Sequence, residues 1–161
     1  MEKEILIQYQ EIVNFNLLSD IDKKMINKAQ EISNVAYAPY SQFQVGASVL
    51  LENNLIITGN NQENSSFPCG ICAERVALFT AKANYKDIPI QKIAITAFSN
   101  NFNLEEPVGP CGLCRQVLLE YELKQNTDIE ILLFNSKKII KIAKAQYLLP
   151  LYFKENKLKR T

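Results

Sequence analysis

The residues with the clearest chemical potential are four cysteines, which form two Cys-x-x-Cys pairs. Cys69 and Cys72 make the first pair, and Cys111 and Cys114 make the second. Each pair directly follows a proline and precedes apolar residues at helical spacing, so each is predicted at the start of a helix. A thiol there faces free backbone N–H groups and the positive end of the helix dipole, which favour the thiolate. The two pairs therefore indicate metal binding or thiol chemistry.

The absence of histidine restricts the reactions that the chain can catalyse. It excludes Ser-His and Cys-His nucleophiles and every histidine metal ligand. Proton transfer near neutral pH must then come from carboxylates, thiols, lysines or a metal-bound water. Glu74 lies two residues after Cys72, in the first turn of the predicted helix, where its carboxylate can reach a metal at the helix end. By itself, Glu74 is also explained as an acid that complements the helix dipole.

Three interpretations of the cysteines are open. A redox site needs one Cys-x-x-Cys pair, whereas this chain has two. A structural zinc site would use all four thiolates, but the separation of Cys72 from Cys111 exceeds the roughly 15–20 residues typical of that motif. A chain of this length can also form a core without a metal clip. A catalytic zinc would use three cysteines and leave one position open to water, and Glu74 favours this interpretation because a closed site has no use for it.

Length and composition predict a single globular domain. The chain has 161 residues, of which 47% are hydrophobic and 22% are charged. Its 18 Lys and Arg residues nearly balance its 17 Asp and Glu residues, which argues against nucleic acid or an anionic membrane as a partner. The sequence shows no signal peptide and no apolar run near the ~18 residues of a membrane span. We therefore expect a cytoplasmic protein, whose cysteines bind metal or act in catalysis rather than form disulfides.

The hydrophobic pattern predicts an α/β fold that would position the cysteines. Helices are expected over 21–35, 72–84 and 111–123, strands over 43–51, 55–57, 93–98, 129–134 and 138–142, and a weak strand within 4–15. Strands separated by single helices predict right-handed crossovers onto a partly parallel sheet. The expected architecture is a three-layer α/β/α domain over residues 1–161, with a central mixed sheet of about five strands. Residues 1–20 are expected to be an N-terminal extension.

Five short blocks of the sequence resemble one family. Cys72-Ala-Glu74 followed by Pro110-Cys111-Gly-Leu-Cys114 matches the zinc nucleobase-deaminase signature, with Cys in place of its His. The other blocks are Ala36-Tyr-Ala-Pro-Tyr-Ser-x-Phe43-x-Val45-Gly-Ala47, Asn61-x-Glu63-Asn64 and Cys114-Arg115-Gln-Val117. Together they resemble the small three-cysteine cytidine deaminases, from about Ala36 to Phe153. The resemblance implies a cytidine deaminase-like α/β/α fold.

The resemblance also implies a reaction, the zinc-dependent hydrolytic deamination of cytidine and deoxycytidine in pyrimidine salvage. Cys72, Cys111 and Cys114 are expected to hold one Zn²⁺ per chain, which lowers the pKa of its bound water toward ~7. The resulting hydroxide is expected to attack C4 of cytosine while Glu74 moves the protons. A buried carboxylate with a raised pKa suits that task.

Further roles follow from the same resemblance. Arg75 is expected to donate hydrogen bonds to thiolate sulfur, and Arg115 is expected either to do the same or to form a surface or interface ion pair. The expected substrate contacts are Phe43 in the base pocket, Asn61 and Glu63 at the ribose hydroxyls, Ala73, and Phe153, which enters the site of a neighbouring subunit. A homotetramer is therefore expected.

The sequence departs from the family pattern at two positions, and two alternatives stay open. Cys69 occupies a position that is not a ligand in the family, and Phe67 stands where relatives often carry Tyr. Blasticidin S deaminase is the alternative within the superfamily, and a non-enzymatic four-cysteine zinc module is the alternative outside it. A polynucleotide substrate would favour a basic groove, but the one basic cluster, residues 154–160, is expected to be a solvated terminus.

Overall fold

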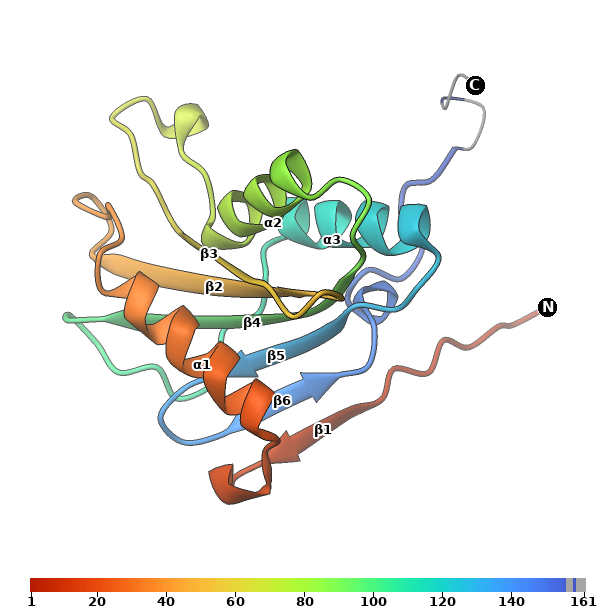
Figure 1. Cartoon of the computed structure of the whole chain (residues 1–161), viewed down its shortest axis with the longest axis horizontal. Coiled ribbons are helices and arrows are strands. Elements are labelled where there is room, and N and C mark those ends of the chain that lie inside the picture. Colours follow the sequence, from red (N-terminus) through yellow and green to blue (C-terminus); the bar gives the residue numbers. More distant parts are fainter. Residues whose placement is uncertain (156–157, 159–161) are drawn as a thin grey trace.

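Strands rich in apolar residues form one mixed sheet in the computed structural model, which describes residues 1–155 and 158. The strands are β1 (Tyr9–Ile12), β2 (Phe43–Leu51), β3 (Ile56–Asn60), β4 (Ile90–Ser99), β5 (Glu130–Phe134) and β6 (Ile139–Ile142). Their order in the sheet is β1-β6-β5-β4-β2-β3 (Figure 1). Only β4 and β5 are adjacent and parallel, and the other neighbours are antiparallel. The predicted mixed α/β class is confirmed.

Three α-helices cover the two faces of this sheet (Figure 1). They are α1 (Asp20–Ser33), α2 (Ala73–Asn84) and α3 (Gly112–Gln125). On one face, Met25 and Ala29 of α1 belong to the same buried cluster as Phe134. On the other face, Leu78 of α2 and Leu118 of α3 belong to a separate buried cluster. The sheet thus has one core on each side, as the three-layer α/β/α prediction requires.

The strand directions bring the starts of α2 and α3 to the same end of the sheet. Strands β3 and β4 are each antiparallel to β2, which lies between them, so they point the same way. Helix α2 follows β3 and helix α3 follows β4. Both helices therefore begin beyond the same end of the sheet, and this places the two cysteine motifs close together.

The N-terminal segment supplies a sixth strand, one more than the approximately five expected. Strand β1 pairs antiparallel with β6, from Tyr9 opposite Ile142 to Ile12 opposite Ile139. It is shorter than the segment 4–15, because only the end of that segment reaches the core, where Ile12 packs beside α1. At the other end of the chain, the expected basic terminus 154–160 lies partly outside the described residues.

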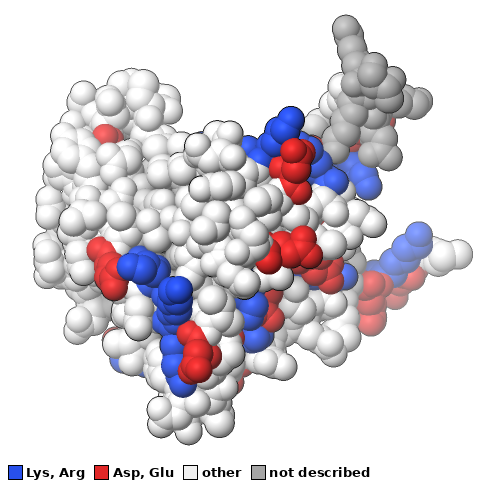
Figure 2. Space-filling model, viewed as in Figure 1, with Lys and Arg blue, Asp and Glu red and all other residues white. Residues whose placement is uncertain are grey.

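Charged side chains of both signs are interspersed on the face shown in Figure 2. Beneath α1, four of them form a network that joins this helix to three strands. Lys92 contacts both Asp22 (2.7 Å) and Glu130 (2.8 Å), and Lys141 contacts Glu130 at 3.0 Å. Burial alone would raise the pKa of Asp22, but hydrogen bonds from Lys92 and Ser19 and the charges of Lys92 and Lys141 lower it.

None of the helices in the described part of the chain combines the length and apolar character needed to cross a lipid bilayer.

Candidate metal centre and active site

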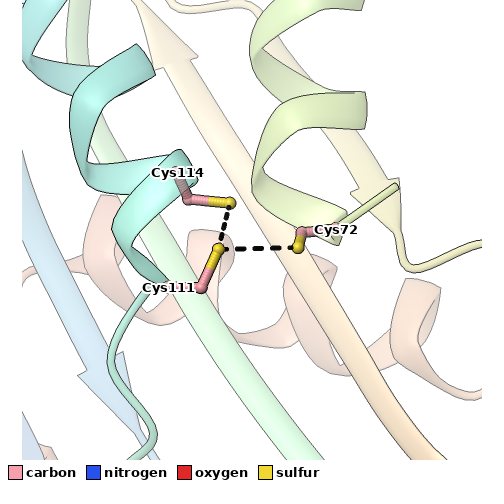
Figure 3. Close-up of side chains that lie close together, drawn as sticks. All are labelled: Cys72, Cys111 and Cys114. Carbon is pink, nitrogen blue, oxygen red and sulfur yellow. Dashed lines mark hydrogen bonds between the residues drawn. The ribbon is translucent and has the colours of Figure 1, made fainter. Parts of the chain in front are cut away.

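Three cysteine sulfurs meet where α2 and α3 begin (Figure 3). Cys72 and Cys111 are the residues immediately before the two helices, and Cys114 lies in the first turn of α3. The Sγ atoms of Cys72 and Cys111 are 3.8 Å apart, and those of Cys111 and Cys114 are 3.5 Å apart. All three sulfurs lie within 4.8 Å of one another. Because α2 and α3 begin at the same end of the sheet, Cys72 lies close to Cys111 and Cys114, although it is 39 positions from Cys111 in the sequence.

The spacing of these sulfurs fits a tetrahedral zinc ion. Two thiolates at about 2.3 Å from such an ion lie about 3.8 Å apart, close to the distances observed. Cys69 lies outside this cluster, on a short 3₁₀ helix, and its side chain is exposed. Three cysteine sulfurs therefore converge on one point, and the arrangement does not support a four-cysteine module.

The Glu74 carboxylate is buried directly beside the sulfurs. Only 4% of the residue is exposed. Burial raises its pKa above the ordinary value, and the negative charge of Cys72 raises it further. Hydrogen bonds with its own backbone N–H and with Cys114 oppose these effects without cancelling them. A raised pKa brings a carboxyl group closer to the range in which it can both accept and release a proton.

The Arg75 guanidinium contacts the cluster from α2. Its Nη2 donates a hydrogen bond to the Cys72 sulfur at 3.8 Å. The pKa of the Cys72 thiol is lowered to about 5, chiefly because Cys114 hydrogen-bonds to its sulfur. Burial acts in the opposite direction, while Arg75 and Cys111 stabilise the thiolate further. These contacts favour the thiolate form of Cys72, the form that binds a metal cation.

Arg115 donates hydrogen bonds to main-chain carbonyls, and its expected roles at the sulfurs or in an ion pair stay predictions. Its Nε donates to the carbonyl of Pro110 at 2.8 Å, and its Nη1 donates to the carbonyl of Leu148 at 3.0 Å. The guanidinium fork is occupied by main-chain oxygens rather than by a thiolate or a carboxylate. Arg115 instead joins the loop before α3 to the C-terminal segment.

Asn61 and Glu63, the expected ribose contacts, lie in the loop after β3 and are partly engaged with the protein. The Asn61 amide accepts from Val45 N at 2.8 Å and donates to the Phe43 carbonyl at 2.9 Å. Glu63 accepts from the backbone N–H of Tyr40 at 2.8 Å and from the N–H and hydroxyl of Ser41. Despite the burial contribution, which raises it, these hydrogen bonds lower the pKa of Glu63. Both side chains are thereby fixed in orientation and retain further hydrogen-bonding capacity.

An open cavity of about 400 Å³ lies next to these loops. Glu63 and Phe67 line it, and the Phe67 ring meets Tyr40 edge to face with 5.9 Å between centroids. Phe43 is half-buried at the start of β2. Ala73 has no exposed surface. Its expected contact with substrate stays a prediction.

The C-terminal segment carries Phe153, whose side chain does not enter this chain's own thiol cluster. The residue is 72% exposed, and its carbonyl accepts a hydrogen bond from Gln116 of α3. The start of this segment is held by Glu122, a buried carboxylate that accepts from the N–H groups of Ala145 and Gln146. Sequence reasoning missed Glu122, because no local pattern distinguishes it from an exposed helical acid.

Sequence reasoning also missed Phe102 in the loop between β4 and α3. Its ring stacks on Phe43, with 6.2 Å between centroids and 17° between planes. The two residues are far apart in sequence, so no spacing rule could have paired them.

Comparisons with known proteins agree on one family. The family model described as "Cytidine and deoxycytidylate deaminase zinc-binding region" matches residues 19–127. A cytidine deaminase from Sporosarcina psychrophila is 36% identical over 136 residues, which is 84% of this chain and 93% of that protein. One from Halalkalibacterium halodurans is 42% identical over 101 residues, 62% of this chain and 72% of that protein. The crystal structure of cytidine deaminase from Burkholderia pseudomallei superposes with a TM-score of 0.71 and 34% identity, covering 81% of this chain and 98% of that one.

Proposed function

Because the chain belongs to the cytidine and deoxycytidylate deaminase family, we propose that it hydrolyses cytidine and deoxycytidine to uridine and deoxyuridine, releasing ammonia. The observation that carries this proposal is the buried Glu74 beside three convergent thiols. A thiol cluster alone would suit a structural metal, whereas an adjacent carboxyl group with a raised pKa suits proton transfer.

The metal belongs to the family's zinc-binding region, and Cys72, Cys111 and Cys114 are the proposed ligands of one ion. When bound there, zinc supplies Lewis acidity that makes a water molecule reactive near pH 7. The combined negative charge of three thiolates and the Glu74 carboxylate would exceed the positive charge of a divalent cation. The positive charge of Arg75 moderates this excess through its hydrogen bond to Cys72.

Glu74 is the proposed proton carrier of the reaction. It accepts a proton from the water that adds to C4 of the pyrimidine, and delivers this proton to N3. It then takes the remaining proton of that water from the hydroxyl now bound to C4 and transfers it to the amino group, which leaves as ammonia while the C4 carbonyl forms. Its burial, with 4% exposure, limits the contact of the carboxyl group with bulk water and raises its pKa, which supports this role.

The nucleoside is proposed to lie between the thiol cluster and the loops after β3. Phe43 offers a ring for the base, while Asn61 and Glu63 offer an amide and a carboxylate to the ribose hydroxyls. The hydrogen bonds that already fix Asn61 and Glu63 support this assignment, because a prepositioned polar group loses little entropy when it binds.

The proposed assembly is a homotetramer that acts in the cytoplasm in pyrimidine salvage. The exposed ring of Phe153, on a segment tied to α3, supports a role in a neighbouring subunit's site. The four cysteines are unpaired, which supports a reducing compartment.

Purified protein with measured zinc content tests the proposed reaction. Loss of cytidine absorbance and release of ammonia are followed for cytidine, deoxycytidine, deoxycytidylate and blasticidin S. We expect turnover of the first two compounds at one zinc per chain, without any added organic cofactor. If zinc-loaded protein converts only one of the other two compounds, the substrate assignment is wrong although the family assignment stands.

A further inference from the structure

The loop between β4 and α3 holds an aromatic ring over the start of β2. This loop contains residues 100–111 and ends at Cys111. Phe102 is flanked by Asn101 and Asn103, and its ring is stacked on Phe43. Stacking at this separation is a favourable aromatic geometry. A ring in such a polar loop is not required by the hydrophobic core.

Phe102 is only partly buried, and its aromatic contact is the one with Phe43. The residue is 53% exposed. It borders a cavity of about 690 Å³ between α1 and the loop, so that side of the ring lacks core packing. In the described part of the chain, Phe102 is the one ring that stacks on Phe43.

The loop is anchored just beyond Phe102. Asn135, in the turn between β5 and β6, donates from its amide to the carbonyls of Leu104 and Glu105, both at 3.3 Å. The same turn contributes Lys138, which forms an ion pair with Glu106 at 2.6 Å. These contacts restrict the positions that the Phe102 ring can reach.

The backbone of Phe43 is fixed from both sides, but its ring needs separate support. The Phe43 N–H donates to the Ser41 hydroxyl at 3.0 Å, and its carbonyl accepts from Asn61. Neither hydrogen bond restrains the side-chain torsions. We propose that Phe102 is a positioning residue that holds the Phe43 ring in the orientation that receives the nucleoside base. This inference rests on the proposed function of the site.

Steady-state kinetics of single and double variants test this role. Phe102→Ala is expected to raise KM for cytidine about three- to tenfold, the range that corresponds to one lost aromatic contact, and to leave kcat and bound zinc unchanged. Phe102→Tyr keeps the ring and should retain the original KM. In a Phe43→Ala background, Phe102→Ala should cause no further increase, because the ring that it positions is already absent.

Asn103→Ala is the matched control, since it changes the adjacent loop residue without removing a ring. It should leave KM unchanged. An unchanged KM in Phe102→Ala, or an equal increase with and without Phe43, would overturn the inference while leaving the deaminase assignment intact. Wild-type protein that does not act on cytidine would overturn the proposed function together with this inference.

Fluorescence gives a readout that does not depend on turnover. The chain has no tryptophan, so Phe102→Trp introduces a single tryptophan next to Phe43. Titration with the product uridine should change its emission. Phe79→Trp, on α2 and 41% exposed, should show no response and serves as the control. Emission from Phe102→Trp that saturating uridine leaves unchanged would contradict a role for Phe102 at the base site.

Discussion

Arg115 donates a hydrogen bond from Nη1 to the carbonyl oxygen of Leu148, at 3.0 Å. The same guanidinium donates to the Pro110 carbonyl, one residue before Cys111. The Arg115 side chain thus links the loop just before α3 to the C-terminal segment that leads to Phe153. Displacement of one end would therefore be transmitted to the other.

Replacement of Arg115 should affect both ends of this link. Arg115→Ala is expected to lower the free energy of unfolding by about 1–3 kcal/mol, because it leaves two carbonyls without a charged donor. KM for cytidine should rise as well, since the C-terminal segment loses its attachment. Denaturant unfolding and kinetics measure the two effects, and Arg115→Lys should recover only part of each. An unchanged free energy of unfolding in the alanine variant would show that these hydrogen bonds do not stabilise the fold.

Serine variants of two neighbouring cysteines distinguish a ligand from a bystander. Cys69→Ser should retain one zinc per chain and most of the activity, because Cys69 lies outside the sulfur cluster. Cys72→Ser should release the metal and destabilise the protein, since metal binding contributes to folding. Bound zinc is measured by elemental analysis after gel filtration. Equal loss of zinc from both variants would support the four-cysteine alternative instead.

Glu74→Gln separates chemistry from metal binding. Gln has nearly the same shape as Glu but cannot carry protons, so turnover should fall by about 10²–10⁴-fold. Zinc content and the unfolding transition should stay close to wild type. Stopped assays at high enzyme concentration can quantify the residual rate. Activity near that of the wild type would remove Glu74 from the mechanism.

Phe153→Ala tests whether a neighbouring subunit completes the site. Light scattering of the wild type should give the mass of a tetramer, and the variant should show an increased KM at unchanged zinc content. The ring is 72% exposed in the single chain, so its removal should cost little stability in the isolated fold. A fully active monomer at assay concentration would contradict this prediction.

The network around Asp22 should make stability depend on pH. The pKa of Asp22 in the folded chain lies below its ordinary value of 3.8, because its lysine partners outweigh the effect of burial. Its stabilisation is therefore complete above the unfolded-state pKa and is lost as pH falls through the folded-state value. Asp22→Asn should be destabilised by about 1–3 kcal/mol at pH 7, and by less at pH values below the folded-state pKa of Asp22. Thermal unfolding at pH 7 and in that acidic range measures the difference. Equal destabilisation under the two conditions would contradict the assigned ion pairs.

Local patterns predicted the helices well and the strands less completely. The segment 21–35 was expected to be helical, and α1 spans Asp20–Ser33 with the Ser19 hydroxyl accepting from Asp22 N–H. Strand β3 was expected over 55–57 but continues to Asn60. Its extension depends on Gly59, where a Cβ atom would lie 2.4 Å from the Ala77 nitrogen. That close approach of helix and strand is a tertiary contact, which local periodicity does not record.

The site was predictable where short motifs carry the chemistry and not where distant residues meet. The cysteine spacing and Glu74 were visible in the sequence, and the structure brings them together. The orientation of Arg115 was not predictable, because its acceptors include Leu148, 33 positions away. The stacking of Phe43 on Phe102 was not predictable either, because the two residues are far apart in the sequence.

The convergence of Cys72 and Cys111 has a consequence for the order of folding. The two residues are 39 positions apart, and β4 lies between them at the centre of the sheet. Their sulfurs meet only after α2 and α3 have both docked on strands that β4 joins. We expect strand pairing and core packing to compensate the entropy of closing this long loop before the ion binds. Tight binding of zinc by all three cysteines would then require an assembled central sheet.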